Sequence, residues 1–523
     1  MHMKRMISIL LCLTLLTSTL SGCRATDDPQ NYVPTGDALE GEVLITDEET
    51  VTEEAQQEQI LSLAYYPDRS MNPLLSTDFT NRALMPLLYQ GLFAVNADYE
   101  AIPILCKSYS VTSDMMTYEF NLDPKATFSD GTKVTADDVV ASLLTAMQSD
   151  YYSGRLYHLG VIHAADADTV QIILFQPLEN LPLLLDIPIV KAKQVDNPNP
   201  LGTGPYVLGR TATGAFLSRR SNWWCTSNDL QITAKQIPLV KAESTTSIRD
   251  AFEFGDVGIV CTDPGSDRYV EYRCDYELWN CETGIFVYLG VNDESPLFQN
   301  RDIRLALSKG IDRRYLTDHY YQGFATPAEL PASADSPYYS QTLAQKYAYD
   351  AEEYQKAMKS VNGQTIRLLV NQSDSFRVKV AREIGRMLST TGMIVEVITM
   401  GTGDYRMLLA EGEYDLYLGQ TKLSPNMDLT PFFSESGALS YGGMDDIGLY
   451  SLCLQALENQ GNYYDLHKAI MDEGYLCPVL FRSYAVYAGR GLVTDLRPAR
   501  DNLFCYSIGR ALEDAFEIHS EGI

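Results

Sequence analysis

Side chains that could act as nucleophiles, acids or bases are few and scattered in this chain. Only six histidines occur in 523 residues, and His158 and His163 stand five positions apart without the spacing of a metal-binding pair. Neither a G-x-S-x-G nucleophile elbow nor an H-E-x-x-H zinc motif is present. The sequence therefore predicts no metal site, no cofactor and no enzymatic activity, and a secreted hydrolase is kept as the less favoured alternative.

The cysteines and tyrosines point to recognition rather than reaction. The ten cysteines include no C-x-x-C pair, which argues against a zinc or redox motif. Cys274 and Cys281 could pair across a hairpin, and buried free thiols explain them at least as well. The 34 tyrosines offer apolar area together with a hydrogen-bonding hydroxyl. Such side chains suit a cleft that closes over a polar ligand.

The charge and the length exclude some classes of function. The formal net charge is −29 and the pI is about 4.5. A nucleic-acid partner is excluded because phosphate binding needs a basic patch. A chain of 523 residues is long enough for two or three domains.

The amino terminus has the pattern of a targeting segment. Lys4 and Arg5 precede an apolar run, 6–20, that is short for a membrane span. The run closes on Leu20-Ser21-Gly22-Cys23, which resembles the lipobox where bacterial lipoprotein precursors are cut before a lipidated cysteine. We therefore expect a signal peptide over 1–22 and a lipid on Cys23, with an ordinary secretory peptide as the alternative.

An acidic segment follows this cysteine. Residues 23–58 combine many acids with little apolar periodicity, which predicts a flexible tether. No other run of about 18 apolar residues exists, so the lipid would be the only membrane anchor.

The elements that must position a ligand begin with a strand, a turn and a capped helix. Alternation of apolar and polar residues over 118–122 predicts a strand with one buried face. Ser129-Asp130-Gly131 supplies turn residues. Thr135 stands three positions before Asp138, so these two residues can form a capping box at the start of a helix.

The second half of the chain alternates strands with amphipathic helices. Strands are predicted over 366–370, 394–398 and 414–418, with helices over 376–389 and 405–409 between them. This order indicates an α/β lobe with a largely parallel sheet. Ligands in such sheets gather at the carboxyl ends of the strands.

Several motifs along the chain also occur together in one known family. FSDGT at 128–132, followed by T-A-x-D-V-V from Thr135, GTGPY at 202–206 and GIDR at 310–313 stand in the family's order. The chain resembles the family 5 solute-binding proteins, the extracytoplasmic receptors of ABC importers for oligopeptides, dipeptides and nickel complexes. The likeness runs from about Leu61 to about Arg490.

The resemblance implies an α/β fold with two lobes, like periplasmic binding proteins of type II and cluster C, and an extra subdomain. Lobe I would comprise 59–94, 199–286 and 474–523. The subdomain would span 95–198 and lobe II would span 287–473. Hinge closure is expected at crossings near Gly204 and Phe286, although the glycines of GTGPY fit a tight backbone approach equally well.

The resemblance also implies which residues border the cleft. The first strand leads into Tyr65 and Tyr66, GTGPY ends on Tyr206, and a Y-x-x-x-N motif supplies Tyr288 and Asn292. All five are predicted to be cleft residues, with ordinary packing as the alternative.

The segment 418–428 should lie at the mouth of the cleft. Peptide-binding members have G-W-x-x-D here, with the acid paired to the α-ammonium of the peptide. This chain has Gln420 and Leu423 at the tryptophan and acid positions, so the ammonium anchor is missing from its expected place. Thr421, Lys422 and Asp428 complete the predicted site. Lys422 would favour a carboxylate-bearing solute, while Asp428 could replace the anchor or cap a turn.

The expected function is therefore a lipid-anchored receptor on the extracytoplasmic face of a bacterial membrane. It would be a monomer that captures a peptide or similar small polar solute by lobe closure and delivers it to an ABC permease. A ligand-sensing or adhesion lipoprotein with the same fold is the alternative.

Overall fold

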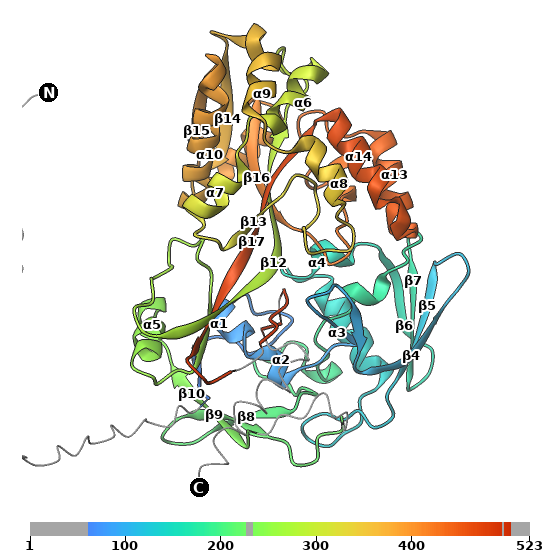
Figure 1. Ribbon diagram of the computed structural model, residues 1–523. Helices are drawn as coiled ribbons and strands as arrows, with labels where there is room; N and C mark the ends of the chain where they lie inside the picture. Colours follow the sequence, from blue (N-terminus) through green and yellow to red (C-terminus); the bar gives the residue numbers. More distant parts are fainter. Residues whose placement is uncertain (1–60, 226–233, 494–495, 501, 504–523) are drawn as a thin grey trace, which may run out of the picture. The chain divides into compact units, whose positions relative to one another are not determined.

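The computed structural model describes residues 61–225, 234–493, 496–500 and 502–503 (Figure 1). All of them belong to one compact unit, residues 58–523. The predicted signal peptide, Cys23 and the acidic tether lie outside the described residues. None of the helices in the described ranges is long and apolar enough to cross a membrane.

One mixed sheet of eleven strands runs through both halves of the protein (Figure 1). In spatial order the strands of its main path are β15 (Ile394–Met400), β14 (Thr365–Asn371), β16 (Leu416–Lys422), β12 (Tyr276–Val291), β17 (Leu476–Gly489), β11 (Ile259–Thr262), β1 (Leu63–Tyr65), β10 (Gln236–Lys241), β9 (Ala215–Arg219) and β8 (Tyr206–Arg210), with β13 (Ala325–Pro327) paired to β17 off this path. The path contains two parallel groups, β1 with β10 and β11, and β14 with β15 and β16. The antiparallel strands β12 and β17 lie between these groups.

The two long strands β12 and β17 connect two separate hydrophobic cores. Cys281, Val486 and Ala488 belong to the core of the first lobe. Val287 and Leu480, near by on the same strands, belong to a core of the second lobe. The passage therefore falls between Cys281 and Val287 on β12, where the pairing is irregular between Glu282 and Ile285.

A small antiparallel sheet extends the first lobe. It consists of β4 (Cys106–Val111), β5 (Thr117–Leu122), β7 (Thr169–Leu174) and β6 (Leu159–Ala164), and a hairpin of β2 (Phe93–Val95) and β3 (Ala101–Pro103) precedes it. The helices of this half are α1 (Phe79–Arg82), α2 (Met85–Leu88), α3 (Ala136–Ala146), α4 (Ser153–Leu156) and α5 (Thr245–Glu253).

The predicted strand, turn and capped helix are confirmed. The strand is β5, and Gly131 adopts a positive φ of 82° in the turn. The helix is α3, and the Asp138 carboxylate accepts hydrogen bonds from the amide of Thr135 at 2.9 Å and from its hydroxyl at 2.8 Å. Local chemistry therefore determines this part of the fold.

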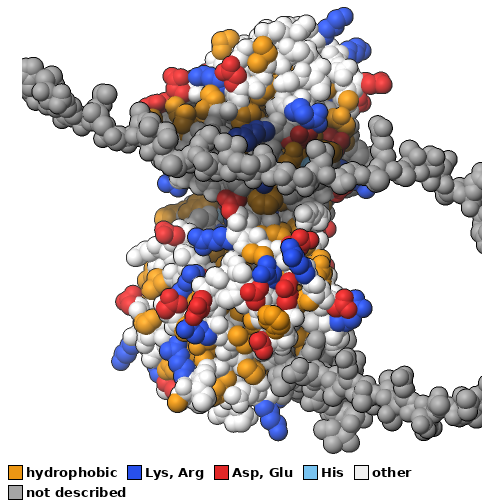
Figure 2. Space-filling view, turned by 90° about the vertical axis from the view of Figure 1, so that its left-hand side faces the viewer, with side chains coloured by type: hydrophobic (Ala, Val, Ile, Leu, Met, Phe, Trp, Pro, Cys, Tyr) orange, Lys and Arg blue, Asp and Glu red, His pale blue; other side chains and the backbone are white. Residues whose placement is uncertain are grey.

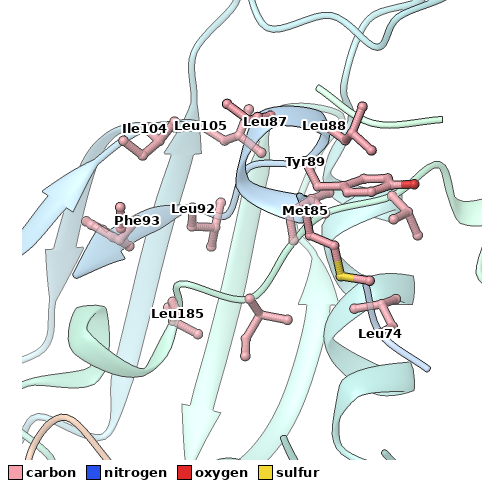
Figure 3. Close-up of a cluster of buried hydrophobic side chains, with 14 of the residues drawn as sticks. Leu74, Met85, Leu87, Leu88, Tyr89, Leu92, Phe93, Ile104, Leu105 and Leu185 are labelled. Atoms are coloured by element: carbon pink, nitrogen blue, oxygen red, sulfur yellow. The ribbon is translucent and has the colours of Figure 1, made fainter. Parts of the chain in front are cut away.

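Leu87 and Leu88 of α2, with Leu92 and Leu105 on either side of the hairpin, help to fill the first core (Figure 3). A Cβ at Gly202 would lie 2.1 Å from the carbonyl oxygen of Leu88, and one at Gly204 would lie 2.5 Å from that of Leu87. The GTGPY motif thus serves a close backbone approach, which was one of its two predicted roles. It packs within the first lobe, away from the passage on β12 and β17.

The second lobe has the predicted alternation of strands and helices. Its parallel strands β14, β15 and β16 are covered by helices, among them α10 (Ser375–Leu388) and α11 (Thr402–Glu411). The other helices of this lobe are α6 (Arg301–Lys309), α7 (Arg313–Tyr320), α8 (Gln341–Ala344), α9 (Ala351–Ala357), α12 (Thr430–Phe433), α13 (Ile447–Glu458) and α14 (Tyr463–Glu473).

Two of the described cysteines were candidates for a disulfide across a hairpin. Cys274 and Cys281 are not bonded to each other.

On the face shown in Figure 2, charged side chains of both signs are interspersed without a large patch of either.

His467 on α14 is fully buried, and neither of its ring nitrogens has a hydrogen-bond partner among the described residues. Burial lowers the pKa of His467 to about 3. In the unfolded chain the imidazole of His467 binds a proton below about pH 6.5, whereas in the folded protein it stays neutral down to about pH 3. Stability must fall as the pH drops from about 6.5 towards 3.

We expect His467→Leu to remove this acid sensitivity. Urea denaturation at pH 7 and pH 5 should show that the wild type loses about 2 kcal/mol more of its free energy of unfolding than the variant does. The exposed His319 on α7 provides the matched control, His319→Leu, which should behave as the wild type. Equal pH dependence of the wild type and His467→Leu would contradict the argument.

Candidate functional site

The carboxyl ends of the parallel strands in the first lobe surround a cavity of about 890 Å³. Loops after β1, β10 and β11 form its wall. The lining residues are Tyr66, Arg69, Ser70, Leu75, Ser76, Thr77, Asp78, Phe79, Thr80, Glu243, Ser244, Thr245, Thr262, Asp263, Ser266, Arg268 and Tyr269. The cavity has the size of a small-ligand site and lies at the strand ends where such sites are expected.

The wall of the cavity is rich in hydrogen-bonding groups. Eight of the seventeen lining residues are Ser or Thr, and their hydroxyls can serve polar groups of either type. Arg69 pairs with Asp78, and its guanidinium lies 4.1 Å from the ring centre of Tyr66. Burial is the main cause of a raised pKa of Tyr66, so this hydroxyl stays protonated and can donate a hydrogen bond.

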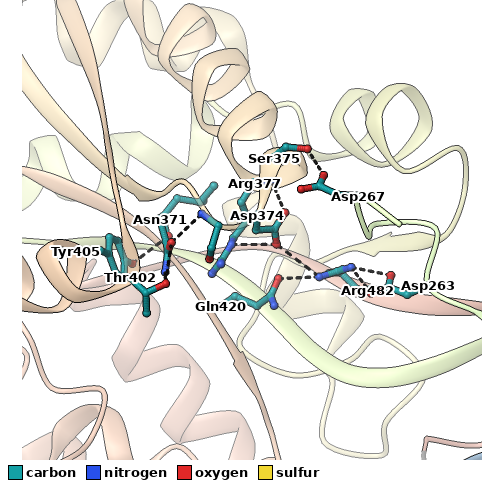
Figure 4. Close-up of polar contacts among 12 residues, drawn as sticks. Asp263, Asp267, Asn371, Asp374, Ser375, Arg377, Thr402, Tyr405, Gln420 and Arg482 are labelled. Carbon is teal, nitrogen blue, oxygen red and sulfur yellow. Dashed lines mark hydrogen bonds and ion pairs between the residues drawn. The ribbon is translucent and has the colours of Figure 1, made fainter. Parts of the chain in front are cut away.

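The second lobe presents the carboxyl ends of its own parallel strands (Figure 4). Asn371 is the last residue of β14, and its side-chain amide donates to the hydroxyl of Thr402 at 3.2 Å. Asp374 caps the amino terminus of α10 by accepting from the Arg377 amide. Gln420 lies on β16. These side chains come from three neighbouring strand ends, so the topology of the sheet gathers them.

Arg482 on β17 joins these side chains to the cavity wall (Figure 4). Its Nη2 donates to both carboxylate oxygens of Asp263, at 2.7 and 2.9 Å. Its Nη1 donates to Gln420 Oε1 at 3.0 Å and lies 3.8 Å from Asp374 Oδ2. Burial alone would lower the pKa of Arg482, but Asp263 beside it raises the pKa above the ordinary value. The guanidinium is therefore a permanent charge shared between the lobes.

Arg377 is a second guanidinium in this region, and its bonding is incomplete. Its side chain is only 12% exposed, and its Nε lies 3.2 Å from Asp374 Oδ2. Among the described residues none accepts a hydrogen bond from its side chain, and Asp374 is its ion-pair partner. Figure 4 shows its end in the space between Asn371, Thr402 and Gln420. A nearly buried cation with open donors can accept an anion as a partner.

Two of the predicted cleft residues take part in this arrangement. Tyr66 lines the cavity, and Gln420 accepts the hydrogen bond from Arg482. Tyr65 is buried in the core of the first lobe.

The other predicted tyrosines and Asn292 have contacts inside the fold. The Tyr206 hydroxyl donates to the Ala234 carbonyl at 2.8 Å. Tyr288 packs against Phe286, Tyr417 and Phe432. The Asn292 side chain donates to the carbonyls of Gly412 and Tyr414 at 3.0 and 2.8 Å. Their role at a ligand remains a prediction.

The predicted site residues at the end of β16 lie in different surroundings from one another. Thr421 is half-buried opposite Phe286. The ammonium of Lys422 donates to the Tyr151 hydroxyl at 3.1 Å and lies 4.9 Å from the centre of that ring. Leu423 is buried, and its carbonyl accepts from the guanidinium of Arg500. A cation, and not a carboxylate, therefore stands beside the position where peptide-binding members have their acid.

Asp428 is buried against the small sheet of the first lobe. Its Oδ2 lies 2.6 Å from His158 Nε2 and also accepts from the Tyr157 hydroxyl, while Oδ1 accepts from the Thr430 amide at 2.8 Å. The Gln176 amide nitrogen lies 2.7 Å from His158 Nδ1, which places the proton of a neutral imidazole on Nε2.

Burial raises the pKa of Asp428, but the hydrogen bonds from His158 and Tyr157 outweigh it and hold that pKa below its ordinary value. The carboxylate thus stays ionised, and its contacts include the predicted turn-capping bond to the Thr430 amide.

Sequence reasoning missed Asp263, Asp374, Arg377 and Arg482. Two signals were available, because Asp263 directly follows β11 and Asp374 follows β14. Polar residues at the carboxyl ends of parallel strands are candidates for ligand contact. Among the described residues no group of three His, Cys, Asp or Glu side chains could hold a metal ion.

Known proteins resemble the chain over most of its length. The profile of the family described as bacterial extracellular solute-binding proteins, family 5 Middle, matches residues 100–440. The glutathione-binding protein GsiB of Pectobacterium atrosepticum is 27% identical over 354 residues, which cover 64% of this chain and 68% of that protein.

Solved structures have the same fold. The substrate-binding protein CtaP of Listeria monocytogenes superposes with a TM-score of 0.68 at 18% identity, covering 86% of this chain and 98% of that one. The oligopeptide-binding protein AppA of Bacillus subtilis, solved with a nonapeptide, gives 0.59 at 16% identity, covering 86% and 97%.

We expect Asp428→Asn to destabilise the fold. Removing the charge of a buried carboxylate that accepts hydrogen bonds from His158, Tyr157 and Thr430 should lower the free energy of unfolding at pH 7 by about 3 kcal/mol, which urea denaturation measures. Asp445→Asn changes an exposed carboxylate in the same β16–α13 connection and should leave the free energy unchanged within about 0.5 kcal/mol. An Asp428→Asn protein as stable as the wild type would contradict a structural role.

Proposed function

Because the chain belongs to the bacterial extracellular solute-binding proteins of family 5, we propose that it captures a peptide or peptide-like polar solute and delivers it to an ABC permease. One observation carries the proposal. The carboxyl ends of the parallel strands in the first lobe border a polar cavity of about 890 Å³, and Arg482 joins Asp263 of its wall to Gln420 at the strand ends of the second lobe. The protein binds and releases the solute without a chemical step.

Lobe closure is the physical basis of capture. The lobes share β12 and β17, and the pairing of these strands is irregular where they pass from one core to the other. Bending there would change the angle between the lobes with little loss of core packing. A ligand favours the closed state to the extent that it binds that state more tightly than the open one.

The ligand is proposed to carry a carboxylate. Arg377 has open donors in a nearly buried place, and a carboxylate can pair with a guanidinium through two hydrogen bonds. This takes over the role that the sequence assigned to Lys422, whose ammonium is engaged with Tyr151. Glutathione, the compound in the name of the relative GsiB, carries two carboxylates.

Recognition is proposed not to depend on an α-ammonium at the usual place. Leu423 stands at the acid position and is buried, and Arg500 lies beside its carbonyl. A positive group brought there would meet a like charge, which disfavours binding.

The protein is further proposed to be a monomeric lipoprotein on the extracytoplasmic face of the membrane. The support is the sequence Leu20-Ser21-Gly22-Cys23, together with the acidic segment 23–58 that follows. A lipid on Cys23 would keep the receptor near the permease.

Calorimetry with glutathione, its diethyl ester and its N-acetyl derivative tests the ligand proposal. We expect the ester to bind roughly tenfold to a hundredfold more weakly than glutathione, the effect of one lost charged hydrogen-bond pair. N-acetylation should change the affinity little. Arg377→Gln should weaken glutathione binding by a similar factor and abolish the discrimination against the ester.

The exposed Arg382 on the same helix supplies the matched control, Arg382→Gln, which should bind glutathione as the wild type does. Equal affinities for glutathione and its ester in the wild type would contradict a carboxylate requirement. Loss of binding on N-acetylation alone would instead indicate an ordinary ammonium anchor elsewhere in the cleft.

The lipid anchor has its own test. Mass spectrometry of the membrane-extracted protein should find a diacylglyceryl group on an amino-terminal Cys23. Cys23→Ala should leave the protein unmodified, whereas Thr26→Ala, three residues further on, should be processed normally. An unmodified and freely secreted wild-type protein would contradict this prediction.

A further inference from the structure

The loop that follows β11 reaches from the first lobe to the second. It spans 263–268, and its first residue, Asp263, holds the Arg482 guanidinium through two hydrogen bonds of 2.7 and 2.9 Å. Arg482 pairs across β12 with Ile285, just beyond the irregular pairing, and its Nη1 is bound to Gln420 of the second lobe. The Asp263 carboxylate therefore bonds, at the passage between the two cores, to a charge that is also bound to the second lobe.

Gly265 lets the loop lie flat on that guanidinium. A Cβ at this position would stand 2.4 Å from Arg482 Nη2 and 2.9 Å from Cζ. Gly265 does not have a positive φ, so the guanidinium that Asp263 and Gln420 hold, and not the backbone, would have to shift to admit a side chain here. The loop and Arg482 are thus complementary in shape as well as in charge.

A second contact between the lobes comes from the same loop. The Ser375 hydroxyl donates to Asp267 Oδ1 (Figure 4). Ser375 is the first residue of α10, next to Asp374, which lies 3.8 Å from the Arg482 guanidinium. The Asp263–Arg482 and Ser375–Asp267 contacts involve only groups of the protein itself, so they need no ligand to form.

We propose that the loop 263–268 is a latch that keeps the lobes closed in the absence of ligand, with Arg482 as its positioning residue. Opening would break both hydrogen bonds between Asp263 and a guanidinium that is 6% exposed in the docked arrangement, and hydrogen bonds to a charged group are costly to lose. The closed state is therefore populated before a solute arrives, and the solute binds with less cost of closure. This inference rests on the proposed capture by lobe closure and assigns the regulation of that closure to named residues.

Gly265→Ala tests the latch because its methyl group collides with Arg482 only when the loop is docked. Small-angle scattering of the ligand-free protein should give a compact wild type and a larger radius of gyration for Gly265→Ala. We expect the ratio of closed to open molecules to fall roughly tenfold or more, the scale of one lost charged hydrogen bond. Gly214→Ala is the matched control, since a Cβ at this exposed glycine meets nothing within 4 Å.

Ser375→Ala is a second variant that tests the latch even if Gly265→Ala does not fold. It removes only the exposed hydrogen bond to Asp267, so it should open the lobes to a smaller degree. Scattering curves of both variants that match the wild type would overturn the latch, and so would a ligand-free wild type that is already open. No ligand enters this experiment, so its failure is separate from a failure to bind glutathione.

Discussion

The buried charge of Arg482 constrains both halves of this protein. Its side chain is 6% exposed, close to where β17 leaves one hydrophobic core for the other. A guanidinium in that place must be given acceptors, and they come from both sides: Asp263 from the first lobe, Gln420 from the second. The need to satisfy one charge therefore couples a cavity wall to the strand ends that face it. Rearranging either lobe changes the bonding of Arg482.

The sheet topology explains why recognition residues gather near this charge. Each lobe contributes a parallel group whose carboxyl ends carry polar loops, and β12 with β17 holds the two groups in one continuous sheet. The loops after β1, β10 and β11 form the cavity, and the residues after β14 supply Asp374 and Arg377. Parallel strands thus supply the side chains, while the antiparallel pair supplies the connection between the lobes. The proposed capture by lobe closure needs both, because its ligand would contact the two lobes.

Sequence reasoning was accurate where the determining interactions are local. The strand, turn and Thr135–Asp138 box need only a few consecutive residues, and so do the strands and helices between 365 and 418. The site was harder to predict, because the partners of Arg482 stand at 263, 374 and 420 and meet only through the register of β12 and β17. Tyr206, Tyr288 and Asn292 were chosen by motif, yet the structure gives each a partner inside the fold. A motif can locate a segment of the chain correctly without showing whether its side chains contact a ligand or pack within the fold.

At the end of β16 the chain follows the family's segment order but has a leucine where peptide-binding members have an acid. Leu423, at the position of the peptide-anchoring acid, is buried in an apolar cluster, and Arg500 approaches its carbonyl. The acid that does occur nearby, Asp428, is enclosed by His158, Tyr157 and Thr430, where its charge stabilises a contact between the second lobe and the small sheet of the first. A carboxylate held by that many donors has little capacity left for a ligand ammonium. Under the proposed function, recognition rests on groups whose bonding is still incomplete, and the nearly buried Arg377 guanidinium is such a group. The change from acid to leucine thus shifts the expected complement of the site from a cationic to an anionic group of the solute.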